Sequence, residues 1–226
     1  IQWPNFKGRW LNLVDRYRRW LDRKTAERCA KNLKRNGFDV RLVPTPEAAC
    51  REMLAMITEV ETFGIGGSEP IRQIGIISEL NGMGKTIHDH WKPDLSPDEV
   101  QAVRLDQGRC DCFLCSANAV SAQGEIVNVD GIGNRVTAMT YGPRKVIVVA
   151  GVNKIMPDLT QALERVRKVA GPMRAKSLGM ETPCAETGEC TDCHSPQRIC
   201  RITTILHRRP MLTDISVVLV GTPLGY

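Results

Sequence analysis

Four cysteines late in the sequence have the residue type and the spacing of a metal site. They follow the pattern Cys184-x5-Cys190-x2-Cys193-x6-Cys200, and the prolines and glycine around them favour turns that can wrap a chain around a metal. Iron–sulfur clusters and tetrahedral zinc both accept four thiolates. Zinc sites usually use two close pairs of ligands, whereas only Cys190 and Cys193 form such a pair here. We therefore favour a [4Fe–4S] cluster, with zinc as one alternative and unmetallated thiols or a disulfide as another.

A second group of thiols, Cys110, Cys112 and Cys115, lies in an apolar segment. On a strand, Cys110 and Cys112 share a face, so they could approach the first centre or hold a second ion with Cys115. Cysteine is also among the residues most often buried, where it behaves as a small hydrophobe. We favour this core interpretation for the three thiols.

A group of polar residues follows the two strands predicted at residues 110–115 and 125–129. Ligands bind at the carboxyl edge of parallel α/β sheets, so we expect these side chains to share one site. The asparagines offer paired donors and acceptors, Arg135 a fork for a carboxylate or phosphate, and Asp130 a base or an orienting group. Turn and cap roles explain part of the group equally well. The predicted ligand residues are Ser116, Asn118, Asn128, Asp130, Gly131, Gly133, Asn134 and Arg135.

A glycine-rich turn supplies a further candidate anion site. The sequence GIGGS at residues 64–68 stands between a predicted strand and helix, where backbone N–H groups can face a phosphate or carboxylate. The turn matches neither the dinucleotide fingerprint nor a P-loop, and GMGKT at residues 82–86 lacks the upstream glycine of a P-loop. Nucleotide hydrolysis is therefore not expected. We assign Gly66, Gly67 and Ser68 as ligand residues.

The elements that must position these groups alternate between helix and strand. Apolar residues at helical spacing, together with caps at Thr45 and Ser96, predict helices from Pro46, over 71–80, over 96–105, over 134–140 and over 157–170. Short β-prone runs predict strands at 39–43, 62–65, 110–115, 125–129, 145–150 and 215–220, and their apolar character suits strands buried on both faces of a sheet. The expected fold class is α/β, with an open, largely parallel sheet flanked by helices.

The composition fits one domain of 226 residues that is 42% hydrophobic. No apolar run approaches the roughly 20 residues of a membrane span, and no export signal is recognisable. Nine cysteines, an odd number gathered mainly in two stretches, do not resemble a secreted disulfide framework. We expect a cytoplasmic protein.

The first 37 residues are predicted to form an amphipathic helix packed on the α/β domain. That domain covers residues 38–226 and includes an irregular, cysteine-rich excursion at 172–210. Residues 7–35 hold eleven Lys or Arg against three acids, so their outer face could meet nucleic acid, an anionic membrane or an acidic partner. We favour a solvated face and expect no nucleic-acid partner. The predicted buried stripe is Trp10, Leu13, Tyr17, Leu21, Cys29 and Leu33.

With these residues in view, the sequence resembles the lactate-utilisation (LUD, DUF162) domain family, and its cysteine-rich stretch resembles one branch of that family. The similar stretches cover nearly the whole chain: residues 64–68, DCFLCSANAVSAQGEIVNVDGIGNR at 111–135, GPRKVIVVAGVNKI at 142–155 and TPCAETGECTDCHSPQRIC at 182–200. The resemblance implies a fold shared with ribose-5-phosphate isomerase, CoA transferases and 5-formyltetrahydrofolate cyclo-ligase.

The resemblance also bears on the chemistry. Lys154 matches a lysine of the isomerase pattern, which implies a ligand residue for an anion, and it joins Asn118 and Asp130 as a candidate catalytic residue. The isomerases carry Asp-Gly-Ala-Asp-Glu where this sequence has CSANA at 115–119. Both acids of that motif are missing, so isomerase chemistry by that route is not expected.

The function implied is that of an iron–sulfur LUD protein taking part in the oxidation of lactate or a related 2-hydroxy acid. Its ligand would be a small carboxylate or phosphate, and its partners iron–sulfur or flavin redox subunits. One alternative is an independent transferase, ligase or isomerase-like enzyme on a phosphorylated or CoA-linked substrate, with a structural metal site. Another is an accessory or regulatory protein of a redox complex. The sequence leaves open whether the chain is itself catalytic and whether it forms a homo-oligomer.

Overall fold

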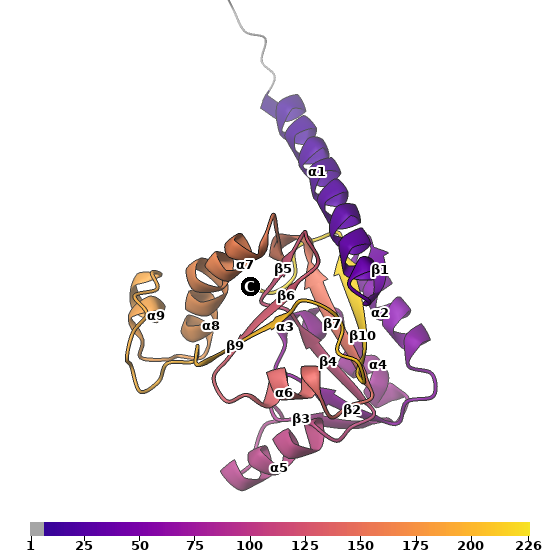
Figure 1. The fold of residues 1–226 in the computed structure, drawn as a ribbon, viewed down its shortest axis with the longest axis vertical. Coiled ribbons are helices and arrows are strands. Elements are labelled where there is room, and N and C mark those ends of the chain that lie inside the picture. Colours follow the sequence, from indigo (N-terminus) through magenta and orange to yellow (C-terminus); the bar gives the residue numbers. More distant parts are fainter. Residues whose placement is uncertain (1–6) are drawn as a thin grey trace, which may run out of the picture.

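A parallel, six-stranded sheet forms the centre of the molecule (Figure 1). The computed structural model describes the backbone of residues 7–226 and the side chains from residue 15 onward. The strand order is β1-β10-β7-β4-β2-β3, and every neighbouring pair is parallel. The predicted α/β class is therefore confirmed. The strands are β1 (Asp39–Val43), β2 (Thr62–Ile65), β3 (Thr86–Asp89), β4 (Cys112–Ser116), β7 (Lys145–Gly151) and β10 (Asp214–Val220).

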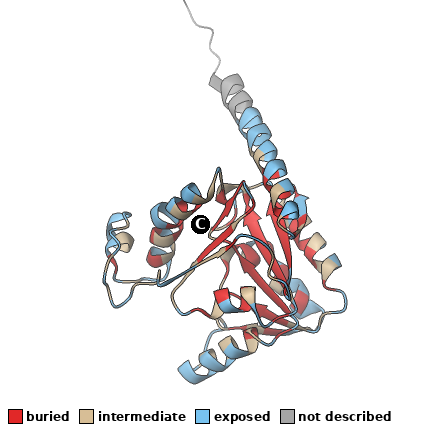
Figure 2. Ribbon diagram, in the orientation of Figure 1, coloured by how far each residue is buried: buried red, intermediate tan, exposed pale blue. Residues whose placement is uncertain are grey.

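Helices cover both faces of this sheet, which leaves its central strands buried (Figure 2). On β4, Cys112 and Leu114 face a core shared with α2 (Pro46–Met56), α3 (Glu69–Gln73) and α4 (Ile76–Gly82). Phe113 and Cys115 point to the opposite core, which contains residues of α1 (Lys7–Arg35) and α6 (Asn134–Thr140). This alternation explains why β4 reads as a continuous apolar run.

The predicted helices are present, with some different boundaries. Thr45 caps α2, and Ser96 forms a capping box at the start of α5 (Pro97–Gln107), as expected. The helix predicted over 71–80 is broken into α3 and α4 at Gly75, whose φ of 78° no helix interior accommodates. A short 3-10 turn, η1 (Val152–Lys154), follows β7.

A second, four-stranded sheet packs beside the first, and its presence corrects one prediction. Its order is β8-β5-β6-β9, with β8 (Ile155–Met156), β5 (Ala119–Ser121), β6 (Ile126–Asp130) and β9 (Ile202–Leu206). The strand predicted at 125–129 was expected in the parallel sheet, but β6 pairs antiparallel with both β5 and β9. The connection between β5 and β6 is too short for the crossover that parallel pairing requires.

The excursion predicted at 172–210 contains more regular structure than expected. The helix predicted over 157–170 is α7 (Leu159–Arg165), and it continues through a π-helical turn, η2 (Val166–Ala170), into α8 (Gly171–Ser177). The wider turn comes directly before Pro172, which cannot donate an N–H and would crowd a regular α-helical turn. A short helix, α9 (Pro183–Thr187), and strand β9 follow, so the longest irregular stretch of the excursion lies between them.

Helix α1 projects from the body, and of its described side chains only those in the C-terminal part are buried (Figures 1 and 2). Ala26, Cys29 and Leu33 are buried, whereas Tyr17 and Leu21, predicted to be buried, are 60% and 52% exposed. The side chains of Trp10 and Leu13 lie outside the described residues, as do residues 1–6 altogether. Within the described chain, no helix is long and apolar enough to cross a membrane.

Candidate functional site

A cavity of about 340 Å³ opens at the carboxyl edge of the parallel sheet. The ends of β7, β4, β2 and β3 form its floor, and residues of η2, α8 and the segment before β9 form its walls. The structure brings most of the predicted ligand residues to this one cavity: Gly66, Gly67, Ser68, Ser116, Asn118, Asp130, Gly131, Asn134, Arg135 and Lys154. Asn128 and Gly133 do not line it.

Lys154 is the buried cation of the site. It is 4% exposed, and its Nζ donates to Ser116 Oγ at 3.0 Å and to the carbonyl oxygen of Ala117 at 3.1 Å. Within the described residues, no carboxylate lies at ion-pair distance from it. Burial, reinforced by the nearby charges of Arg165 and Arg135, lowers the pKa of Lys154 to about 7. At neutral pH this amine can therefore either attract an anion or accept a proton.

Asp130 orients Arg135 and does not act as an available base in this geometry. Its carboxylate accepts from the backbone N–H groups of Ile132 and Gly133, each at 3.0 Å, and from Arg135 Nε at 3.2 Å. Burial opposes ionisation, but Arg135 and these N–H groups outweigh it, so the pKa of Asp130 lies below its usual value. Of the two predicted roles, the geometry supports the orienting one.

Two of the three asparagines of the predicted group, Asn118 and Asn128, have mainly architectural contacts. Asn118 Oδ1 accepts from the backbone N–H of Val129 at 2.8 Å and from Arg135 at 3.2 Å. Asn128, which is buried, accepts from the backbone N–H of Asn118 at 3.0 Å. These hydrogen bonds join Asn118, the residue before β5, to strand β6. They also hold Arg135 at the cavity wall.

The glycine turn forms a wall of the cavity, but its first N–H groups are not available to a ligand. Gly66 donates to the carbonyl of Leu114 and Gly67 to that of Ile65, each at 3.0 Å. A Cβ at Gly66 would lie 2.8 Å from the ring of Phe113, and Gly67 has a φ of +60°. Ser68 Oγ caps the short helix α3. The glycines therefore allow close packing and do not make the expected cradle of donors.

His90 and Gln107 are site residues that the sequence did not reveal. Gln107 is fully buried, and its Nε2 lies 2.8 Å from the carbonyl oxygen of Ile65 and 3.1 Å from that of His88. Because carbonyl oxygens only accept, this nitrogen must donate, and His90 Nδ1 at 2.8 Å therefore accepts. Burial and the charge of Arg104 lower the pKa of His90. The imidazole is thus neutral, with its proton on Nε2.

Asn134 completes the network by donating to Gln107 Oε1 at 3.1 Å.

Trp91, next along the chain, anchors helix α8 to the sheet edge. The guanidinium of Arg72 lies 4.6 Å from the ring centroid, and that of Arg174 on α8 lies 4.5 Å from it. Asp89 binds Arg72 at 2.8 Å, and Glu69 lies 3.7 Å from Arg174. His90 and Trp91 follow β3 directly, and a polar or aromatic residue after a strand is a signal that could have marked them as site residues. The strand β3 itself was not predicted.

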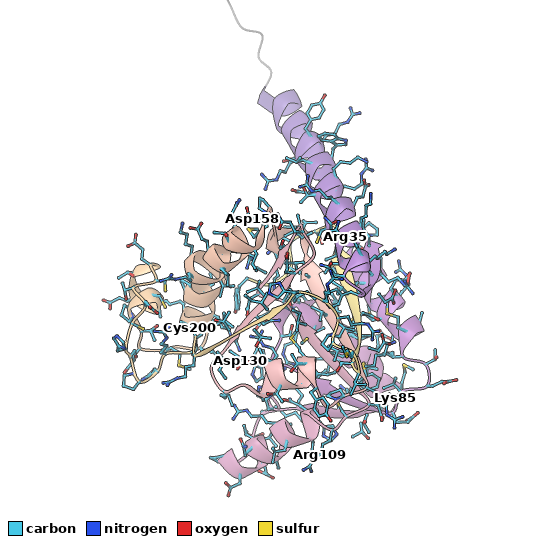
Figure 3. The ribbon with its side chains drawn as sticks, in the orientation of Figure 1. Arg35, Lys85, Arg109, Asp130, Asp158 and Cys200 are labelled. Atoms are coloured by element: carbon cyan, nitrogen blue, oxygen red, sulfur yellow. The ribbon has the colours of Figure 1, made fainter. Side chains whose placement is uncertain are left out.

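The cysteine segment reaches the cavity through Cys200, which lines it. Figure 3 labels Cys200 and Asp130. Arg201 N donates to the carbonyl oxygen of Asp130 at 3.0 Å, which fixes this end of the segment to β6. Arg198 donates to the carbonyl oxygens of Cys193 and Cys200 at 2.8 and 2.9 Å, and it pairs with Asp192 at 2.7 Å. One guanidinium therefore holds two of the four predicted ligand positions together.

The donor set fits a thiolate-bound metal, but its arrangement is not that of an assembled site. All four thiols are free and partly exposed. Among the described residues, however, no group of three or more His, Cys, Asp or Glu side chains is placed to hold a metal ion. A metal would have to gather thiols that this structure leaves apart.

The other cysteine group is part of the core. Cys110, Cys112 and Cys115 are buried, and Cys110 Sγ donates to the carbonyl oxygen of Gln107 at 3.1 Å. Burial raises the pKa of Cys110 and of Cys115 to about 12 and that of Cys112 further. These three thiols stay protonated at neutral pH, which supports the core interpretation.

Comparisons with known proteins agree with this architecture. The family model for the LUD domain matches residues 26–220 of the chain. The fold is similar to the crystal structure of a DUF162 family protein from Deinococcus radiodurans, with a TM-score of 0.53 and 14% identity over 88% of this chain and 98% of that chain. At that identity the likeness concerns the fold alone. No curated protein matches the sequence significantly. Because the family match spans most of the sequence, the chain belongs to the LUD-domain family.

Proposed function

We propose that this LUD-domain protein takes part in the utilisation of lactate or a related 2-hydroxy acid, and that the sheet-edge cavity binds the acid. The observation that carries the proposal is the buried ammonium of Lys154, which has two neutral acceptors and no carboxylate partner among the described residues. An uncompensated buried cation is costly, and an incoming carboxylate removes that cost. Arg135, already oriented by Asp130, adds a second donor at the same wall.

The cavity supplies binding and a proton acceptor, whereas the electrons need another group. Oxidation of a 2-hydroxy acid to a 2-oxo acid releases two electrons and two protons. In molecules whose Lys154 is neutral, the carboxylate would be held by Arg135 instead, and the amine could accept the hydroxyl proton, because its pKa of about 7 leaves part of it unprotonated. We propose that a flavin-bearing partner subunit accepts the two electrons together with the Cα proton, as a hydride; an iron–sulfur partner would accept the electrons alone and the Cα proton would pass to solvent.

The binding of the acid can be tested by calorimetric titration with L-lactate. We expect Lys154→Met to weaken binding at least about 10-fold, the size of one charge-assisted hydrogen bond. Lys34→Met, which removes an exposed lysine of α1, serves as the matched control and should bind as the wild type does. Equal lactate affinity in the wild type and Lys154→Met would refute the assignment.

We further propose that Cys184, Cys190, Cys193 and Cys200 bind a [4Fe–4S] cluster, with zinc as the alternative. The proposal is supported by four free thiols within a short segment that borders the cavity. The test is purification without oxygen, followed by a visible spectrum and assays of iron, acid-labile sulfide and zinc. Cys190→Ser should lose the metal, whereas Cys50→Ala, which removes a cysteine of the α2 core, should keep it. A colourless protein with stoichiometric zinc would exclude the cluster.

The isomerase-like alternative gains no support from the cavity. Two carboxylate side chains among the described lining residues, those of Glu69 and Asp130, both face arginines, at 3.7 and 3.2 Å respectively. Neither is placed as the unengaged base that proton transfer on a sugar phosphate requires.

A further inference from the structure

The cavity is longer than a three-carbon acid. Lys154 contacts Ser116 and Ala117 and so places its ammonium at the end of β4, whereas His90 and Trp91 follow β3. Strand β2 lies between β4 and β3. The ends of β4 and β3 are therefore two inter-strand spacings apart, a distance of about 10 Å at the usual spacing of about 4.8 Å. A lactate ion spans roughly 4 Å by ordinary bond lengths. Held by Lys154, it would leave the β3 end of the cavity unfilled.

The β3 end carries positive charge of its own. Arg104 of α5 lines the cavity, and its Nε is buried without a hydrogen-bond partner. Within the described residues, no ion pair reaches its guanidinium. Arg174 lines the same cavity, where it lies over the Trp91 ring, donates to Ser177 Oγ at 3.4 Å and has a longer contact of 3.7 Å with Glu69. A buried donor without an acceptor costs free energy, and a ligand oxygen would remove that cost.

The neighbouring aromatic groups define what else this end can accept. The guanidiniums of Arg72 and Arg174 lie over the Trp91 ring, 4.6 and 4.5 Å from its centroid, and so occupy space in which a nucleobase would stack. Burial and the charge of Arg104 lower the pKa of His90, so the ring can add an Nε2–H donor, but no charge. The β3 end is therefore suited to an anionic oxygen group and not to an aromatic one.

We infer that the ligand carries two anionic groups, one bound by Lys154 at the end of β4 and the other by Arg104 at the end of β3. The chemical class is an extended aliphatic dianion, such as a dicarboxylate or a phosphorylated carboxylic acid. This inference rests on the proposed function, because it adds a second contact to the anion already assigned to Lys154. It also implies that lactate itself fills only half of the site.

The test compares dicarboxylates with monocarboxylates of equal chain length by calorimetric titration. Succinate, adipate and suberate are matched with butyrate, hexanoate and octanoate, and L-lactate is measured beside them. We expect at least one dicarboxylate to bind about 10-fold more tightly than its partner, as one further charge-assisted hydrogen bond would give. Arg104→Gln should abolish that preference. Arg109→Gln, an exposed arginine outside the cavity, should retain it, and Arg104→Lys should retain part of it even if Arg104→Gln folds poorly.

The outcomes separate this inference from the proposal on which it rests. If lactate and the monocarboxylates bind but no dicarboxylate is preferred, the second anion site is refuted and the first stands. A preference that survives in folded Arg104→Gln also refutes the role of Arg104. If no carboxylate of either series binds, both the inference and the proposed acid site are wrong.

Discussion

Replacing Lys154 by methionine should change how the stability of the protein depends on pH. Burial and the charges of Arg165 and Arg135 lower the pKa of this amine from 10.5 to about 7 in the folded state. The unfolded chain regains the higher value, so it binds the proton more tightly than the folded chain does. The wild type should therefore become more stable as pH rises from 7 towards 10.5, and the buried charge should destabilise it most below pH 7. Lys154→Met lacks this titration.

The size of the effect follows from the two pKa values. In full it amounts to roughly 5 kcal/mol, of which about 3 kcal/mol changes between pH 6.5 and 9.5. The free energy of unfolding of Lys154→Met, relative to that of the wild type, should therefore be highest at pH 6.5 and fall towards pH 9.5. The two hydrogen bonds that Lys154 donates to Ser116 and Ala117 are lost at every pH, each at a cost of about 1 kcal/mol, and so shift the difference without changing its slope.

Urea unfolding followed by circular dichroism at pH 6.5, 8 and 9.5 measures this difference. The buffers should contain no carboxylate or phosphate, because an anion bound to Lys154 would raise its pKa. Lys34→Met provides the control, and its difference from the wild type should not vary with pH. The core thiols titrate in both proteins and cancel. A difference between wild type and Lys154→Met that stays constant over this range would refute the lowered pKa and, with it, the proton-accepting role.

Three further substitutions test how the site is held. Gln107→Met removes the donor facing His90 Nδ1, so the ¹⁵N spectrum of the imidazole should show a shift from the Nε2–H tautomer; an unchanged spectrum would contradict the assigned hydrogen bond. Gly67→Ala should lower the free energy of unfolding by roughly 1–2 kcal/mol, because φ at this position is +60° and the new Cβ would lie 3.3 Å from the His90 ring. Gly82→Ala is the control: the space around Gly82 is open, so this substitution should not lower the free energy of unfolding. Arg198→Gln should speed hydrogen exchange across residues 184–200, since it releases two carbonyls of that segment, and exchange as slow as in the wild type would show that other contacts hold it.

The central sheet could be predicted from the sequence because its middle strands are buried on both faces. Such strands read as short apolar runs, and β4, β7 and β10 were placed correctly for this reason. Strand β3 lies at the sheet edge and has the sequence Thr-Ile-His-Asp, so it carries no such signal. Missing β3 meant missing His90 and Trp91, which follow it directly.

The candidate site shows the same division between local and non-local information. Residues that follow a recognisable strand, such as Ser116 and Asn118, could be assigned to the sheet edge in advance. Gln107 could not, because its role depends on carbonyl groups of β2 and β3 that only the tertiary fold brings to it. The exposure of Tyr17 and Leu21 was missed for a related reason: helical spacing shows that a stripe exists, but not how far the body beneath it extends.

The cysteine segment is hydrogen-bonded to the backbone of the cavity wall, so binding of the proposed metal should change the affinity for the proposed ligand, and the reverse. Arg201 is bonded to the backbone of Asp130, and a side chain at Gly131 would come within 3.0 Å of the carbonyl oxygen of Ile199. Gathering four thiols around a metal would pull on this attachment, and Asp130 is the group that orients Arg135 at the cavity wall. Coupling between two binding sites is reciprocal, so a metal that tightens ligand binding must itself be held more tightly when the ligand is present. Measuring L-lactate affinity with and without the metal, and metal retention with and without L-lactate, should therefore give the same factor from both sides.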